Sequence, residues 1–174
     1  MDLILVWLWL LRVATELKRC REEIRLSWTQ LLETLFLRRE IMPYLVTSIS
    51  CREPEMVQTI GNACDLAVSS TKISDQGRAE QRLGAALERL LAAVEKNPDV
   101  TSDPNFKRLT GELKMLGTRI EFLAGTYNKQ AIAYNIRLAG PSAKVLGLFV
   151  DIARAELFPI VTGNEKNDVS ATGG

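Results

Sequence analysis

The sequence predicts an all-α fold, an elongated antiparallel bundle of three long helices with one shorter C-terminal helix. Two apolar stripes carry this prediction, one in residues 15–50 and one in residues 104–139. Apolar residues that recur in alternating steps of three and four form one face of a helix. Each segment would extend for roughly 50 Å at ~1.5 Å per residue. Matched lengths and short connections favour antiparallel neighbours.

The first long helix carries its expected core on a single stripe. Arg38 occupies the one core-like position of that stripe that is not apolar. Leu32, Phe36 and Leu37 widen the stripe, so more than one partner helix is expected. Pro43 should kink the helix, because proline lacks an amide hydrogen and crowds the preceding turn. The apolar stripe consists of Ile24, Trp28, Leu31, Leu35, Met42, Leu45 and Ile49.

A second helical segment begins near Pro54, since proline is favoured at the first position of a helix. Its apolar rhythm is lost between Ser69 and Gly77, and the two halves are out of phase. We therefore expect a short break or local shift near residues 74–77, without a second domain. The expected inner face consists of Met56, Ile60, Ala63, Cys64 and Ala67 before the break, and of Leu83, Leu87, Leu90 and Val94 after it.

The third long helix has the most regular stripe. Ser102 or Asp103 is expected to cap it, with Pro104 at its first position. The dipeptide Tyr127-Asn128 recurs seven residues later as Tyr134-Asn135, so both tyrosines share one side of the helix and both asparagines share the strip beside it. The stripe consists of Phe106, Leu109, Leu113, Leu116, Ile120, Leu123, Tyr127 and Tyr134.

A fourth, shorter helix is predicted after Gly140 and Pro141, capped by Ser142 and ending near Phe158. Its expected inner face consists of Val145, Leu148, Phe149 and Ile152. The bundle would therefore occupy residues 14–159. Residues 160–174 are mostly small and polar, and we expect them to be disordered.

Composition restricts the possible functions. The chain has 174 residues, which is about one domain, and a net charge of +1, whereas nucleic-acid binders usually carry a basic excess. Histidine is absent, and three widely spaced cysteines give neither a disulfide framework nor a zinc pattern. No catalytic sequence motif is present. We therefore expect no enzymatic activity, no metal, no cofactor and no nucleic-acid partner.

The N-terminus begins with a uniformly apolar run, about half of the ~20 residues that a membrane-spanning helix needs. Asp2 stands where a signal peptide would have a basic start. Three interpretations stay open: the end of a transmembrane helix that starts upstream or was removed, a helix lying in the membrane interface, or a segment buried in the bundle. The first is favoured. The membrane-anchoring candidates are Leu3, Ile4, Leu5, Val6, Trp7, Leu8, Trp9, Leu10 and Leu11.

Basic residues follow this run closely. If the run anchors the chain, the positive-inside rule places the body of the protein in the cytoplasm. The alternative is that these residues, mixed with Glu16, Glu22 and Glu23, form only a solvated helix face. The basic residues are Arg12, Lys18, Arg19, Arg21 and Arg25.

Two groups of residues are candidates for binding. Arg38 and Arg39 have the donor geometry to clamp an acidic group of a partner or lipid. Alternatively, they could pair with a carboxylate of the third long helix such as Glu112 or Glu121, or lie at the edge of the bundle with their charges directed to solvent. The tyrosines of the repeat, Tyr127 and Tyr134, could be packed rings with hydrogen-bonded hydroxyls. The asparagines, Asn128 and Asn135, could bond a neighbouring helix or backbone, or contact a ligand.

Several short motifs occur in a fixed order along residues 14–158. They are Ser27-Trp28-x-Gln30, Arg38-Arg39-x-x-Met42-Pro43-Tyr44-Leu45-Val46, Glu95-x-x-Pro98, Asn105-Phe106, the two Tyr-Asn pairs and Leu146-Gly147-x-Phe149. In order and spacing, the chain resembles the LemA family. Three positions depart from the family pattern: Tyr44 replaces an asparagine, Ala14-Thr15 replaces a Tyr-Asn pair, and Gly140 replaces an aromatic residue.

The resemblance implies a bacterial membrane-anchored protein with a cytoplasmic bundle of long antiparallel helices, whose transmembrane helix ends where Val13 lies. One branch of the family is associated with magnetosome membranes. Two functions are therefore expected. The first is a non-catalytic membrane-associated scaffold that contacts proteins or further copies of itself. The second is a soluble bundle that binds a small apolar or anionic ligand between its helices.

Overall fold

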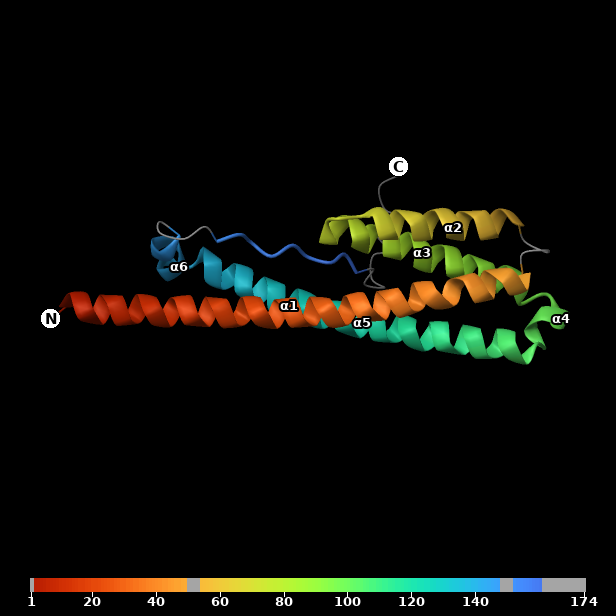
Figure 1. The fold of residues 1–174 in the computed structure, drawn as a ribbon, viewed down its shortest axis with the longest axis horizontal. Coiled ribbons are helices and arrows are strands. Elements are labelled where there is room, and N and C mark those ends of the chain that lie inside the picture. The colour runs from red at the N-terminus through yellow and green to blue at the C-terminus, as the bar shows by residue number, and fades with distance from the viewer. Residues whose placement is uncertain (1, 50–53, 148–151, 161–174) are drawn as a thin grey trace, which may run out of the picture. The chain divides into compact units, whose positions relative to one another are not determined.

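The computed structural model describes residues 2–49, 54–147 and 152–160, and every regular element in these residues is a helix (Figure 1). The predicted all-α class is therefore confirmed. The helices are α1 (Asp2–Ile49), α2 (Pro54–Ser69), α3 (Ile73–Val94), α4 (Pro98–Thr101), α5 (Pro104–Ala139) and α6 (Pro141–Leu146).

The chain forms two compact units, and α1 and α5 contribute to both. Unit 1 comprises Met1–Glu33 and Phe122–Leu157, and unit 2 comprises Thr34–Glu121 and Phe158–Gly174. Each unit therefore combines segments that are far apart in the sequence.

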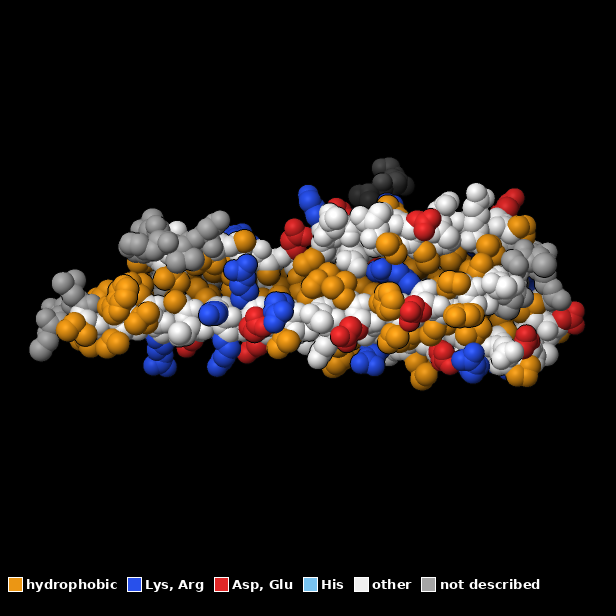
Figure 2. Space-filling model, in the orientation of Figure 1, with side chains coloured by type: hydrophobic (Ala, Val, Ile, Leu, Met, Phe, Trp, Pro, Cys, Tyr) orange, Lys and Arg blue, Asp and Glu red, His pale blue; other side chains and the backbone are white. Residues whose placement is uncertain are grey.

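In unit 1, α1 and α5 run antiparallel, because residue numbers rise along α1 as those of their partners fall along α5. The Arg137 guanidinium donates a hydrogen bond to Cys20 Sγ at 2.9 Å. Ser27 Oγ donates to Gln130 Oε1 at 2.5 Å, and the rings of Trp28 and Tyr127 pack with centroids 5.4 Å apart. The N-terminal end of α1 extends the same helix with apolar side chains on its surface (Figure 2).

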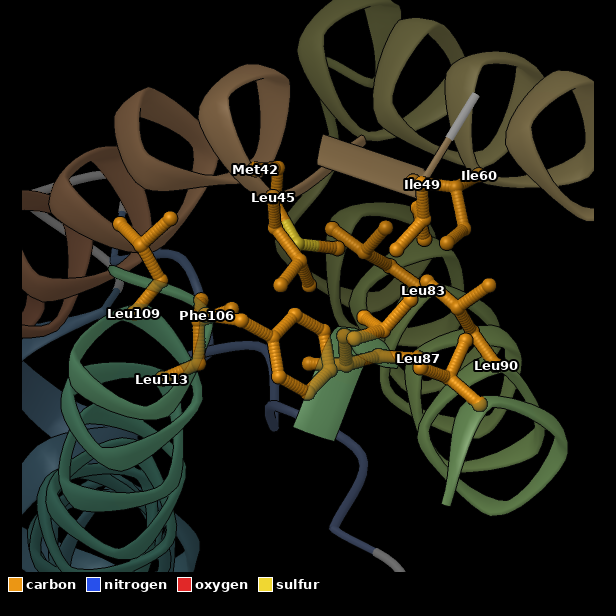
Figure 3. Packing of buried hydrophobic residues seen from close by; sticks show 12 residues of the cluster. Met42, Leu45, Ile49, Ile60, Leu83, Leu87, Leu90, Phe106, Leu109 and Leu113 are labelled. Carbon is orange, nitrogen blue, oxygen red and sulfur yellow. The ribbon is translucent and has the colours of Figure 1, made fainter. Parts of the chain in front are cut away.

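Unit 2 contains the main apolar core (Figure 3), with contributions from α1, α2, α3, α4 and α5. The stripes predicted for the first three helical segments supply most of it, because burying these side chains removes apolar surface from water. The core residues are Met42, Leu45, Ile49, Ile60, Leu83, Leu87, Leu90, Val94, Val100, Phe106, Leu109 and Leu113. The predicted widening of the α1 stripe is wrong at Phe36 and Leu37, which are exposed because packing uses the side of α1 that carries Leu35 and Arg38.

The second helical segment is a hairpin. Residues 70–72 interrupt it, slightly before the predicted 74–77, and α2 and α3 pack side by side (Figure 1). The apolar stripes of α2 and α3 are out of phase along the sequence, so one straight helix could not turn both of them toward the core. Both stripes can face a common core when the chain turns back between α2 and α3. The hydroxyl of Ser70 donates to the Leu66 carbonyl at 2.7 Å and satisfies one of the last carbonyls of α2.

The helical turns before α5 agree in part with prediction. Asp103 caps the N-terminus, because its Oδ1 accepts a hydrogen bond from the Asn105 amide at 2.8 Å. The four-residue helix α4 before it was not expected from the apolar pattern.

The predicted fourth helix is wrong over residues 152–158. Helix α6 is short, its N-cap is Gly140 and not Ser142, and residues 152–160 form an extended segment without helix. We call residues 152–160 the extended segment. Helix formation is disfavoured there because side chains of α5 already bind its backbone carbonyls, as described below. Two of the predicted inner-face positions, Leu148 and Phe149, lie outside the described residues. The predicted disorder of residues 161–174 also falls outside them.

A glycine of α3 allows the extended segment to pack closely in unit 2. A Cβ added to Gly77 would collide with Cδ of Pro159 and lie 2.9 Å from its Cγ. Proline is covalently rigid, so the neighbour cannot move aside as a flexible side-chain end could.

We therefore expect Gly77→Ala to lower the free energy of unfolding by about 1–3 kcal/mol through overpacking, although alanine is the better helix former by about 1 kcal/mol. Gly61→Ala in α2 is the matched control, because its added Cβ would meet no atom within 4 Å. That variant should be neutral or more stable. Urea unfolding monitored by circular dichroism measures both, and equal stabilisation by the two substitutions would contradict the packing argument.

Candidate functional site

The most deeply buried charges of the described chain form one cluster in unit 2, which we call the polar centre: Arg38, Arg39 and Glu80. Both arginines of α1 pair with the single carboxylate of α3. The Arg38 guanidinium donates to Glu80 Oε2 and, at 3.2 Å, to the Glu80 backbone carbonyl. Arg39 Nε donates to Glu80 Oε1 at 2.8 Å. Glu80 is 3% exposed, so these are charge-assisted bonds in a poorly solvated environment.

The polar centre carries one excess positive charge, because two guanidinium groups share one carboxylate. Arg38 Nε is buried without a hydrogen-bond partner. Nearby, burial raises the pKa of the Cys64 thiol, the Glu80 carboxylate raises it further, and Arg39 and Arg38 oppose the shift. Because its pKa is raised, the Cys64 thiol is neutral at neutral pH and supplies no negative charge to the polar centre. Arg38 and Arg39 therefore depend on Glu80 for their counter-charge.

The structure corrects the expected intramolecular partners of Arg38 and Arg39. Glu112 instead pairs with Arg108 of its own helix at 2.7 Å, and Glu121 is exposed. Glu80 was missed because the polar stretch before it obscured the rhythm of α3. The signal was available, since Glu80 lies three residues before Leu83 on the stripe that faces the core. A role of the two arginines in binding a partner stays a prediction.

The repeated Tyr-Asn pairs of α5 face the extended segment in unit 1. The Tyr127 hydroxyl donates to the Glu156 carbonyl at 2.7 Å, and the Tyr134 hydroxyl donates to the Ala153 carbonyl at 3.4 Å. Asn135 donates from Nδ2 to the Ala155 carbonyl and accepts from the Ala155 amide at Oδ1, both at 2.9 Å. The side chains thus replace the helical hydrogen bonds that these backbone groups would otherwise make.

These contacts match the expected hydrogen bonding of the tyrosine and asparagine side chains to backbone. Tyr127 and Tyr134 are buried, and Asn128 also has a partner within the chain. Burial raises the pKa of Tyr127, and the Glu156 carboxylate raises it further. A ligand-binding role for the pairs stays a prediction, since at least three of the four side chains already serve the fold.

Asn135→Ala tests whether this two-point bond holds the extended segment. The substitution leaves the amide and the carbonyl of Ala155 without their partner, and we expect a loss of about 1–3 kcal/mol in the free energy of unfolding. Amide hydrogen exchange at Ala155 should accelerate in proportion. Lys129→Ala, an exposed change on the same helix, is the control. Unchanged exchange at Ala155 would contradict this assignment.

The predicted anchoring residues lie at the N-terminal end of α1. Ile4, Leu5, Val6, Trp7, Leu8 and Trp9 are each about half to two-thirds exposed, and Leu11 is also exposed. The interpretation that this segment is buried in the bundle is therefore wrong. No helix among the described residues has the length and hydropathy needed to cross a membrane.

Charged groups alternate along α1 after the apolar end. Three of the five basic residues pair with glutamates on the same helix: Arg12 with Glu16, Arg19 with Glu23, and Arg25 with Glu22. Such exposed pairs contribute about 0–1 kcal/mol each. Among the described residues, no group of three or more metal-ligating side chains is placed to hold a metal ion.

These observations define a helical protein with a buried polar centre, a clamped extended segment and an exposed apolar helix end. The sequence profile of the LemA family matches residues 27–172, and the chain therefore belongs to the LemA family. A comparison with curated protein sequences finds no significant match. Family membership indicates a membrane-associated helical protein, and the LemA family is not known as a family of enzymes.

Proposed function

We propose that this protein is a non-catalytic scaffold held at a membrane by the N-terminal end of α1. One observation carries the proposal: residues 4–9, near the N-terminal end of α1, expose large apolar side chains, two of them tryptophans. Contiguous exposed apolar surface of this kind is rare in soluble proteins unless it contacts a membrane or a partner.

The distribution of apolar residues around the helix supports axial insertion. Six consecutive exposed apolar residues cover every face of the helix, whereas a helix that lies in the interface has one polar face. Residues 4–11 would reach about 12 Å at ~1.5 Å per residue, which is less than half of the ~30 Å hydrocarbon core. The described residues 4–11 would therefore occupy about one leaflet with Leu11 at the edge of the hydrocarbon, and Trp9 and Trp7, about 3 Å and 6 Å deeper at ~1.5 Å per residue, lie near the boundary region that tryptophan favours.

The charges that follow support an orientation. Lys18 and Arg21 have no ion pair among the described residues and are exposed beyond the apolar end. Basic residues that follow a membrane segment favour the cytoplasmic side. We therefore place the helical body in the cytoplasm, where its surface contacts other proteins or further copies of the chain. Organisation of a magnetosome membrane would be a special case of this function.

Substitution of both exposed tryptophans, Trp7→Ser with Trp9→Ser, tests the proposal. Each buried apolar side chain is worth about 1.5–3 kcal/mol, so partitioning onto lipid vesicles should fall at least about tenfold. Co-sedimentation of the full chain with vesicles that contain anionic lipid measures it. The matched control is Phe36→Ser with Tyr44→Ser, two aromatic residues that are equally exposed elsewhere on α1.

The wild type and the control should sediment with vesicles, and the tryptophan variant should remain in solution. A wild-type chain that stays wholly in the supernatant would overturn the proposal. The alternative function, a soluble bundle that binds a small ligand, has less support, because Arg38 and Arg39 already donate hydrogen bonds to Glu80, and Asn135 already bonds Ala155.

A further inference from the structure

A hollow in unit 1 begins just beyond the apolar end of α1. It has a volume of about 370 Å³ and lies between α1 and the junction of α5 with α6. This volume falls within the range of about 300–1,000 Å³ that small-molecule sites have. It is lined by Val13, Glu16, Leu17, Arg137, Gly140 and Ser142.

The position of the hollow along α1 sets its depth at a membrane, given the axial insertion proposed above, on which this inference rests. Val13 and Leu17 lie about 3 Å and 9 Å beyond Leu11 at ~1.5 Å per residue. The headgroup layer on each side of a bilayer is about 5–7 Å thick. When the apolar end is inserted as far as Leu11, the end of the hollow at Val13 therefore lies among the phospholipid headgroups, and the end at Leu17 lies at their outer, aqueous edge.

The lining contains one carboxylate, Glu16, and one guanidinium group, Arg137, and each can form further hydrogen bonds with a ligand. Glu16 is 3.9 Å from Arg12, and their side chains are 54% and 81% exposed, so this pair is weak. Arg137 donates from one nitrogen to Cys20 Sγ at 2.9 Å, and sulfur is a weak acceptor. The remaining guanidinium donors of Arg137 are available to an oxygen ligand.

We propose that this hollow binds the headgroup of a phospholipid that carries both a phosphate and a primary ammonium group, as ethanolamine phospholipids do. Arg137 and the Ser142 hydroxyl donate to the phosphate oxygens, and Glu16 accepts from the ammonium group. Val13, on the side of the hollow that faces the bilayer, contacts the apolar part next to the headgroup. A choline headgroup has no N–H to donate, and a purely anionic headgroup would leave Glu16 facing a phosphate.

The test compares vesicles that differ only in headgroup. One set contains choline phospholipid, the other replaces part of it with ethanolamine phospholipid, and both hold the same small fraction of anionic lipid. The variants are Glu16→Gln and Arg137→Gln. Their matched controls are Glu23→Gln, whose residue forms the same type of pair with Arg19 at 3.5 Å, and Lys129→Gln on the same helix as Arg137.

We expect the wild type to prefer the ethanolamine vesicles by about three- to fivefold, which is the size of one modest ion pair. Glu16→Gln and Arg137→Gln should each bring this preference close to one, while Glu23→Gln and Lys129→Gln should retain it. The controls also separate headgroup binding from the looser packing of ethanolamine lipids, because a packing effect would survive in all four variants.

Three results would overturn the inference and leave the scaffold function standing: equal binding to both vesicle sets, loss of preference in the control variants, or a preference that persists in Glu16→Gln and Arg137→Gln. Free O-phosphoethanolamine, titrated calorimetrically, should bind much more weakly than the vesicles, and comparable affinity would indicate a soluble ligand and overturn the lipid assignment. No binding to any vesicle would instead overturn the scaffold function itself. Matched thermal unfolding of all variants excludes misfolding.

Discussion

Replacing Glu80 with glutamine is expected to lower the free energy of unfolding by about 3–5 kcal/mol, because it leaves the buried guanidinium of Arg38 without a counter-charge and also removes the partner of the partly exposed Arg39. The carboxylate is 3% exposed and receives hydrogen bonds from both Arg38 and Arg39. Glutamine has nearly the same shape, so the effect isolates charge from packing. Urea unfolding at pH 7, followed by circular dichroism, measures the change.

The control for this substitution is Glu88→Gln, a change of the same kind at an exposed position of α3, which should alter stability by no more than about 0.5 kcal/mol. The double variant Arg38→Met with Glu80→Leu should recover much of the loss, because apolar residues of similar volume replace buried ion pairs at little cost. Arg39 is 16% exposed at its side chain and can direct its charge to solvent. A loss below about 1 kcal/mol for Glu80→Gln would contradict the dependence on Glu80.

The second large effect is expected for Tyr127→Ala, a loss of about 3–5 kcal/mol from the cavity that the ring leaves. Tyr127 is 1% exposed and packs against Trp28 with ring centroids 5.4 Å apart. Tyr127→Phe keeps the ring and removes only the hydrogen bond to the Glu156 carbonyl, so about 1 kcal/mol is expected. Tyr44→Ala, at a tyrosine that is 69% exposed, is the control. Urea unfolding of the three variants separates ring packing from the hydroxyl bond, and a similar loss at both tyrosines would contradict the structure.

The raised pKa of Tyr127 adds a pH dependence to this comparison. Burial favours the neutral phenol, so the unfolded chain releases this proton at lower pH than the folded chain. The contribution to stability is complete below the ordinary tyrosine pKa of about 10 and falls as the pH rises through it. Tyr127→Phe should therefore lose less stability than the wild type between pH 9 and 11.

The stripes of α1 and α5 could be predicted well from sequence. Ile24, Leu31 and Leu35 are buried as expected, as is Arg38 at the charged position of the stripe. In a long helix the spacing of apolar residues repeats over many turns, so a few polar residues on the stripe do not obscure its helical period. The partner of Arg38 could not be predicted, because α1 fixes which residues share a face but not which carboxylate of another helix meets that face.

The extended segment was missed because its composition favours a helix. Alanine, arginine, glutamate and leucine are good helix formers, and residues 153–157 contain only these. The hydrogen bonds from Tyr127, Tyr134 and Asn135 outweigh this local preference. The repeated Tyr-Asn pairs indicated side chains with bonds to make, but they did not identify the backbone that would receive them.

The extended segment has a consequence for insertions and deletions. Such changes are usually tolerated where a chain lacks regular secondary structure. Here, Tyr134 bonds Ala153, Asn135 bonds Ala155 and Tyr127 bonds Glu156, all within unit 1. At about 3.3 Å per residue, loss of a single residue between these points would put later carbonyls out of reach of their donors, so chain length matters more here than residue identity.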